Sequence, residues 1–208
     1  CMDNDVLRRG KPTVHVQFGE AQALLAGDAL QAFAFELLTP DNTLIPAAMQ
    51  AALCRLLARA AGSAGMAGGQ AIDLASVGVA LTEAQLRQMH RLKTGALLQG
   101  SVLMGALCGH AAPTAYQALS DYGAAMGLAF QVVDDILDVV ADSVTLGKTA
   151  GKDAAADKPT YVSLLGLERA QAYAQELLAE AHAALGRSGL PDTRALAALA
   201  DMVVRRSH

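Results

Sequence analysis

Three observations in the sequence predict an all-α protein. The first is composition: of the 208 residues, 53% are hydrophobic, only 4% are aromatic and none is Trp, which favours helices over strands. The second is a capping box, Thr82 with Gln85 three positions on, which starts a helix that should reach about Cys108. The third is the run 123–140, where Gly, Gln and Asp recur every three or four positions among apolar residues, as on one face of a helix.

Two more helices are expected in the first third of the chain, from apolar stretches and the residues that bound them. The first covers 18–38, and Thr39 with Pro40 ends it, because proline cannot continue a helix. The second covers 46–61, where Pro46 suits the first turn, whose backbone N–H groups have no partner within the helix.

The Gly-rich run 62–69 is typical of a flexible loop when composition alone is considered. Two helices, 160–186 and 192–206, finish the chain, and Pro191 opens the second. No linker separates two units, and 208 residues can bury one hydrophobic core. A single domain over residues 1–208 is therefore predicted.

Charge, hydropathy and cysteine usage argue against several classes of protein. The net charge is −4, from 16 basic and 20 acidic residues, and provides no basic field for nucleic acid. The most apolar stretch, 96–109, is shorter than the roughly 20 residues that cross a bilayer. The cysteines have no C-x-x-C spacing, so neither disulfides nor zinc are indicated and we expect a cytoplasmic protein. They are Cys1, Cys54 and Cys108.

Four polar side chains share one stripe of the helix expected at 123–140. Asp134 and Asp138 lie one turn apart, Asp135 flanks them, and Gln131 precedes Asp134 on the same side. Carboxylates this close raise one another's pKa unless a cation neutralises them. Mg²⁺ suits this role, because it binds one or two carboxylates and keeps waters and phosphate oxygens as its other ligands.

An Asp-rich stripe is also typical of a helix face turned to solvent. The surrounding residues favour instead a buried helix whose stripe lines a cavity, because six Val, Ile and Leu side chains crowd residues 132–140. Gly123 and Gly127 continue the stripe, although glycine costs roughly 1 kcal/mol of helix propensity at each position. We expect another helix or a ligand to approach closely there.

The sequence F-Q-V-V-D-D-I-L-D at 130–138 is similar to the second aspartate-rich motif of the trans-prenyltransferases, the farnesyl diphosphate synthase family. Other segments agree in the same order and at suitable spacing, so the resemblance spans essentially the whole chain. They are C-M-D-N-D-V-L-R-R-G-K-P-T-V-H at 1–15, G-D-A-L at 27–30, G-G-Q-A-I-D-L at 68–74, H-R-L-K-T-G at 90–95 and the Gly-Lys loop at 147–152. The resemblance, to bacterial-type farnesyl and geranylgeranyl diphosphate synthases, implies a helical bundle of the isoprenoid synthase type around a central cavity.

The resemblance also implies a metal site with two carboxylate walls. In the family the first aspartate-rich motif, D-D-L-P-x-M-D, comes just before R-R-G-x-P-x-x-H. Asp3 therefore aligns with its last aspartate, and the leading pair is expected before Cys1, in N-terminal helices that this chain lacks. Asp3 would join Asp134, Asp135 and Asp138 as a ligand of Mg²⁺ or Mn²⁺.

Seven residues are implied to bind substrate, and five of them lie in the R-R-G, K-T-G and aspartate-rich motifs. By the alignment Arg8 would hold the allylic diphosphate and Arg9 the isopentenyl diphosphate, and the planar fork of arginine suits phosphate oxygens. Lys93 matches the family's diphosphate-binding lysine, and Thr94 the residue that faces the developing allylic cation. Gln131 is a candidate for the same role, so Lys93, Thr94 and Gln131 form the implied catalytic set.

Two further pairs are assigned by the same resemblance. Lys148 and Lys158 match lysines that close over a diphosphate; a P-loop is excluded here, because Asp142 stands where that motif needs Gly. Gln70 and Asp73, three apart, would lie behind the diphosphate end of the cavity and support the binding residues, although an ordinary capping role is the alternative. The resemblance makes their segment a helix packed tightly on its neighbours.

The implied activity is that of a short-chain trans-prenyl diphosphate synthase, which condenses isopentenyl diphosphate with dimethylallyl or geranyl diphosphate, with farnesyl diphosphate as the favoured product. A homodimer is implied as well. The alternatives are a non-catalytic subunit of a heteromer and a class I terpene cyclase, although cyclases lack the paired R-R-G and K-T-G elements. His90 is interpreted as structural, and Arg205 with Arg206 as either a basic tail over the isopentenyl site or a frayed terminus.

Overall fold

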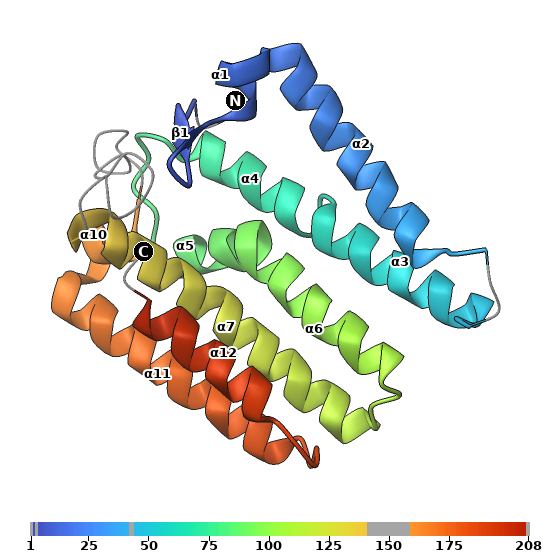
Figure 1. Ribbon diagram of the computed structural model, residues 1–208. Helices are drawn as coiled ribbons and strands as arrows, with labels where there is room; N and C mark the ends of the chain where they lie inside the picture. The colour runs from blue at the N-terminus through green and yellow to red at the C-terminus, as the bar shows by residue number, and fades with distance from the viewer. Residues whose placement is uncertain (1, 3, 42–43, 141–158, 207–208) are drawn as a thin grey trace.

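The computed structural model describes residues 2, 4–41, 44–140 and 159–206, and this part of the chain is helical apart from one short hairpin. Figure 1 shows the longer helices lying side by side as an arc, which α2 begins and α11 and α12 end. The all-α prediction is confirmed. The helices are α1 (Val14–Phe18), α2 (Glu20–Leu38), α3 (Ala47–Ala61), α4 (Met66–Ala75), α5 (Glu83–His90), the π-helix η1 (Arg91–Gly95), α6 (Ala96–Cys108), α7 (Pro113–Val140), α10 (Tyr161–Leu165), α11 (Leu167–Arg187) and α12 (Arg194–Arg205).

The hairpin lies at the start of the chain, where strand β1 (Leu7–Arg8) pairs antiparallel with β2 (Lys11–Pro12). Its turn residues, Arg9 and Gly10, have positive φ angles of 52° and 71°. A two-residue turn of this kind matches the twist of the strands that it joins. The turn therefore presents Arg9 at the tip of the hairpin.

Two glycines separate consecutive helices, and the second of them, Gly166, divides a helix that the sequence predicts as continuous over 160–186. Gly19, with φ of 95°, separates α1 from α2, and Gly166, with φ of 79°, separates α10 from α11. Side chains of L-residues disfavour this conformation, so the chain turns at glycine. The other bounds agree within about two residues: α3 follows Pro46 directly, and α12 begins at Arg194.

The Gly-rich run joins α3 to α4 through a turn, and the helix predicted from the resemblance begins at Met66. A side chain at Gly65 would collide with the carbonyl oxygens of Arg59 and Ala60. Only a glycine lets the chain turn back this tightly over the end of α3. The loop expected from composition is therefore confined to the start of the run.

The capping box of Thr82 and Gln85 is present at the start of α5, as predicted. The stretch to Cys108 is helical throughout, but it widens to a π-helix at η1, a local form that is frequent at functional sites. Beside it, a Cβ on Gly127 would stand 2.5 Å from the Cα of Gly95. The expectation of a close approach at Gly127 is confirmed, since α7 meets η1 backbone to backbone.

The hydrophobic core surrounds α7, which packs against α6 on one side and α11 on the other. Val132 and Ala129 are fully buried in it, and the Tyr122 hydroxyl donates to the Leu196 carbonyl of α12 at 2.8 Å. α2, by contrast, contains no buried residue. Among the described residues, no helix combines the length and apolarity that crossing a membrane requires.

Candidate functional site

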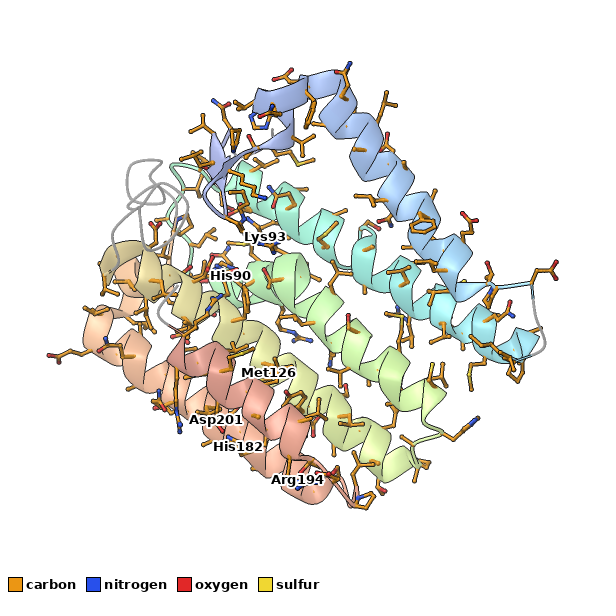
Figure 2. The ribbon with its side chains drawn as sticks, viewed as in Figure 1. His90, Lys93, Met126, His182, Arg194 and Asp201 are labelled. Carbon is orange, nitrogen blue, oxygen red and sulfur yellow. The ribbon has the colours of Figure 1, made fainter. Side chains whose placement is uncertain are left out.

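An ion pair joins α4 to the π-helix. The Lys93 ammonium donates to a carboxylate oxygen of Asp73 at 2.7 Å, and the Asp73 side chain is only 6% exposed. Gly69 lets the two helices approach closely enough, because any side chain there would collide with the backbone of Lys93. Asp73 therefore fixes the position of the Lys93 ammonium, while the Lys93 side chain remains 26% exposed. Figure 2 shows where Lys93 lies in the bundle.

A series of hydrogen bonds runs from the π-helix along the polar stripe of α7. The Thr94 hydroxyl donates to Gln131 Oε1 at 3.1 Å, and Gln131 Nε2 donates to an oxygen of Asp135 at 3.1 Å. The other Asp135 oxygen accepts the backbone N–H of Tyr161 at 2.8 Å, at the start of α10. Asp135 is 2% exposed, and it fixes both the Gln131 amide and the end of α10.

Asp134 lies beside these hydrogen bonds and contacts Arg206, the residue that follows α12. Arg206 donates to a carboxylate oxygen of Asp134 at 3.2 Å and to the Phe130 carbonyl at 3.0 Å, and its guanidinium lies 4.0 Å from the centre of the Phe130 ring. Burial lowers the pKa of Arg206 from its ordinary value, whereas the Asp134 carboxylate favours the charged form. Arg206, the last residue that the structure describes, is therefore held in the site by Asp134 and Phe130.

His90 lies below Lys93 in the view of Figure 2. Its ring stacks on that of Tyr161, with the ring centroids 5.6 Å apart. Both side chains are buried, and neither His90 ring nitrogen nor the Tyr161 hydroxyl has a hydrogen-bond partner among the described residues. Burial first, and the nearby Lys93 cation second, lower the pKa of His90 to about 4. His90 is thus neutral at pH 7, in agreement with the structural interpretation.

The carboxylates of α7 have the donor chemistry that Mg²⁺ requires. Asp134 is partly exposed and already accepts a cationic group, and Asp138 follows one turn later on the same stripe. In the described ranges, no group of three or more His, Cys, Asp or Glu side chains could hold a metal ion without other ligands. Mg²⁺ commonly binds through one or two carboxylates plus phosphate oxygens, so Asp134 and Asp138 fit such a site.

The structure brings together Asp73, Lys93, Thr94, Gln131 and the α7 carboxylates, but it does not connect every predicted residue to them. Arg8 and Arg9 are exposed on the hairpin, and within the described residues their side chains make no hydrogen bond or ion pair. Gln70 is partly buried on α4, one turn before Asp73. Asp3, Lys148 and Lys158 lie outside the described residues, and their roles stay predictions.

Sequence reasoning missed the parts played by Tyr161 and Asp135 in positioning, and it left Arg206 undecided. Tyr161 acts through its backbone N–H, which carries no sequence signal. Arg206 stands 72 positions from Asp134, so no local spacing connects them. A signal was available only in the Thr160 to Ser163 capping box, which marks where α10 begins.

Comparison with known proteins identifies relatives that share both the sequence and the fold. The chain is 53% identical to a probable farnesyl diphosphate synthase of Sinorhizobium fredii, covering 100% of this chain and 62% of the relative. It is 47% identical to a farnesyl diphosphate synthase of Escherichia coli, covering 100% of this chain and 71% of that protein. The chain thus spans roughly three fifths of the Sinorhizobium relative, and 58% of a similar Bradyrhizobium diazoefficiens protein.

Among solved structures, a Helicobacter pylori geranyltransferase complexed with magnesium and isoprenyl diphosphate superposes with a TM-score of 0.84 at 37% identity, covering 97% of this chain and 65% of the other. A Caulobacter crescentus polyprenyl synthase complexed with calcium and isoprenyl diphosphate superposes with a TM-score of 0.88 at 30% identity, covering 99% of this chain and 72% of the other. The bundle therefore has the isoprenoid synthase fold. Because the polyprenyl synthetase family matches residues 1–189 and these solved structures share the fold, the chain belongs to the polyprenyl synthetase family.

Proposed function

We propose that this chain carries the activity of a short-chain trans-prenyl diphosphate synthase, which condenses isopentenyl diphosphate with dimethylallyl or geranyl diphosphate to form farnesyl diphosphate. One observation carries the proposal: the π-helix holds the Lys93 cation and the Thr94 hydroxyl against the polar stripe of α7. The names of the Sinorhizobium and Escherichia relatives support farnesyl diphosphate as the product.

Asp134 and Asp138 would hold Mg²⁺, with Mn²⁺ as an alternative, and the Helicobacter structure with magnesium and isoprenyl diphosphate supports this choice. When bound, the metal supplies charge neutralisation to the diphosphate leaving group. Asp135 remains a further proposed ligand, and both of its oxygens also accept hydrogen bonds that hold Gln131 and α10. Asp3 remains a proposed ligand from the other wall.

The side chains of this site have separate tasks in the reaction. Lys93, aimed by Asp73, binds diphosphate oxygens and stabilises the negative charge that grows as the allylic C–O bond breaks. Thr94 and Gln131 place oxygen atoms next to each other, where they can stabilise the allylic cation. The double bond of isopentenyl diphosphate then forms the new C–C bond, and the proton lost passes to the released diphosphate, because His90 is buried and weakly basic.

The remaining proposed ligands surround this centre. Arg8 and Arg9 would bind the allylic and isopentenyl diphosphates, and Lys148 and Lys158 would close over a diphosphate. Figure 1 shows the hairpin of Arg8 and Arg9 at the same end of the bundle as α5 and α10. Gln70 would support the site from α4, as Asp73 does.

A product assay tests the proposal. The protein would be incubated with Mg²⁺, radiolabelled isopentenyl diphosphate and geranyl diphosphate, and farnesyl product is expected after phosphatase treatment. Lys93→Ala should lower turnover at least 100-fold, about 2.7 kcal/mol of transition-state stabilisation. A hydrocarbon formed from geranyl diphosphate alone would instead indicate a terpene cyclase, and metal-dependent binding without any product would indicate a non-catalytic subunit.

We also propose a cytoplasmic homodimer. The apolar side chains of α2 support self-association, because Leu24, Leu25, Leu30, Phe33 and Leu37 are all exposed, from 49% for Phe33 to 67% for Leu30. Cys54 and Cys108 are free thiols, which fits a reducing compartment.

A further inference from the structure

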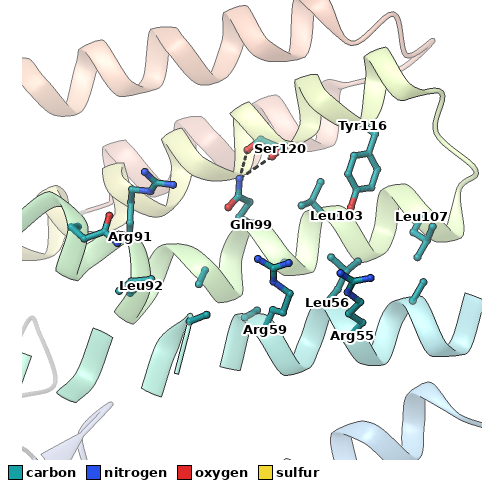
Figure 3. A pocket seen from close by; sticks show the side chains of 16 residues that line it. Arg55, Leu56, Arg59, Arg91, Leu92, Gln99, Leu103, Leu107, Tyr116 and Ser120 are labelled. Atoms are coloured by element: carbon teal, nitrogen blue, oxygen red, sulfur yellow. Dashed lines mark hydrogen bonds between the residues drawn. The ribbon is translucent and has the colours of Figure 1, made fainter. Parts of the chain in front are cut away.

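A groove of about 620 Å³ lies between α3, the α5 to α6 stretch and α7 (Figure 3). This volume is within the roughly 300–1,000 Å³ that is usual for small-molecule sites. We name it the arginine groove. The residues that characterise it are Arg55, Leu56, Arg59, Arg91, Leu103 and Leu107.

The charge of the arginine groove is not compensated by the protein. None of its lining residues is Asp or Glu, and within the described ranges no carboxylate pairs with Arg55, Arg59 or Arg91. Six other arginines of the same ranges do form ion pairs: Arg87 with Glu83, Arg169 with Glu176, Arg187 with Asp121, Arg194 with Asp192, Arg205 with Asp201 and Arg206 with Asp134.

The arrangement of the three arginines suits an anion. Arg55 and Arg59 are one helical turn apart on α3, so their like charges repel each other, and Figure 3 shows both reaching towards α6. Arg91 adds a third cation from the π-helix on the other wall. Guanidinium groups bind phosphate oxygens through paired N–H donors, and an anion bound between Arg55 and Arg59 would remove their repulsion.

The floor of the groove is closed where α6 meets α3. A Cβ on Gly100 would stand 3.0 Å from the Ala60 Cβ, which shows that α6 and α3 are in direct contact there. Gln99 donates from Nε2 to the Ser120 carbonyl at 3.0 Å and fixes α6 to α7 at the far wall (Figure 3). Leu103 and the other leucines can therefore cover an aliphatic chain that continues from the arginines.

The groove is separate from the candidate site. Leu92, Gln99 and Leu103 face it, whereas Lys93 and Thr94 of the same helical stretch contact α4 and α7. None of the site residues described above lines the groove. A ligand in the groove would thus leave the candidate site open.

We propose that the arginine groove binds a phosphate or diphosphate ester with an aliphatic chain, and specifically a prenyl diphosphate. The headgroup is held by Arg55, Arg59 and Arg91, and the chain lies along the leucines. The choice of a prenyl diphosphate rests on the proposed function, since the product of that reaction has this chemistry. The cationic and apolar character of the groove does not depend on it.

Calorimetric titration of farnesyl diphosphate into the 208-residue protein, with EDTA present, tests the proposal. The double variant Lys93→Ala, Asp134→Asn serves as background, because it disables the candidate site and leaves the groove unchanged. Binding is expected in this background. Adding Arg55→Gln and Arg59→Gln should raise the dissociation constant at least tenfold, whereas the control Arg194→Gln, which removes an equally charged surface group, should change it less than twofold.

Two further probes identify the part of the ligand that is recognised. Inorganic diphosphate should bind at least tenfold more weakly than farnesyl diphosphate, because it lacks the chain. Vesicles of phosphatidylglycerol should not retain the protein, and retention that requires Arg55 and Arg59 would assign the surface to a membrane and overturn the proposal.

Two results in the titration would also overturn it: unchanged affinity after the Arg55 and Arg59 substitutions, or no binding in the background variant. Melting curves confirm that each variant is folded. If the double arginine variant is not folded, Arg91→Gln takes its place, and the dissociation constant for farnesyl diphosphate is expected to rise at least threefold. The condensation assay remains independent, so an absence of binding in the background variant, together with normal turnover of the wild type, contradicts only this proposal.

Discussion

His90 couples the stability of the fold to pH at the level of a single residue. Its pKa is lowered by burial from 6.5 to about 4, so the folded protein resists protonation that the unfolded chain accepts. The stabilisation is complete above pH 6.5 and is lost as the pH falls towards 4. At roughly 1.4 kcal/mol for each pKa unit, the loss approaches about 3.5 kcal/mol.

We expect His90→Phe to reduce this dependence. Phenylalanine keeps the ring that stacks on Tyr161 and removes the titrating nitrogens. Urea unfolding at pH 7, 6, 5 and 4.5 would show a smaller decrease in the free energy of unfolding for the variant than for the wild type. Equal decreases in the two proteins would mean that other groups carry the pH dependence.

Asp134 provides a residue-scale test of the proposed metal site. Asp134→Asn should lower turnover at least 100-fold, about 2.7 kcal/mol, because an amide cannot supply the negative charge of a metal ligand. Asp121→Asn is the matched control, since it also removes a carboxylate of α7 that pairs with an arginine, Arg187, at the surface. The turnover of the control variant should stay within twofold of that of the wild type. Turnover of Asp134→Asn within tenfold of the wild type would refute the metal assignment.

At the scale of elements, the contact between α7 and the π-helix positions Thr94 and Gln131. Gly127→Ala would place a methyl group 2.5 Å from the Gly95 Cα, and neither backbone can yield easily. We expect a loss of about 1–3 kcal/mol in the free energy of unfolding, together with lower turnover.

Gly105→Ala on α6 is the control for this substitution, because nothing lies within 4 Å of the added methyl group. It should stabilise the protein by up to about 1 kcal/mol, since alanine favours a helix more than glycine does. Chemical unfolding measures both variants. A Gly127→Ala protein as stable as the control would show that the two helices can separate without cost.

At the scale of the whole molecule, the exposed face of α2 is the surface that we expect to form the homodimer. The double variant Leu30→Glu, Phe33→Glu should weaken self-association at least 100-fold, because charges replace two exposed apolar side chains. Met202→Glu, which changes an equally exposed apolar residue of α12, should leave it intact. Sedimentation equilibrium at micromolar concentration distinguishes these cases, and a monomeric wild type would disprove the dimer.

Features that depend on residues close together in the chain could be predicted before the structure was known. The capping box of Thr82, the apolar period of α7 and the carboxylate stripe all follow from spacings of three or four residues, which is the range over which helix contacts act. Gly123 and Gly127 also predicted a close helix contact, although they did not identify the partner.

Which of these polar groups contact one another depends instead on long-range packing. Asp73 pairs with Lys93 across 20 positions, Thr94 reaches Gln131 across 37, and Arg206 reaches Asp134 across 72. Such contacts depend on how whole helices pack, and packing is a property of shapes and volumes summed over many residues. The spacing of residues in the sequence does not show how the helices pack. The polar stripe could therefore be predicted from the sequence, whereas the partners of its side chains could not.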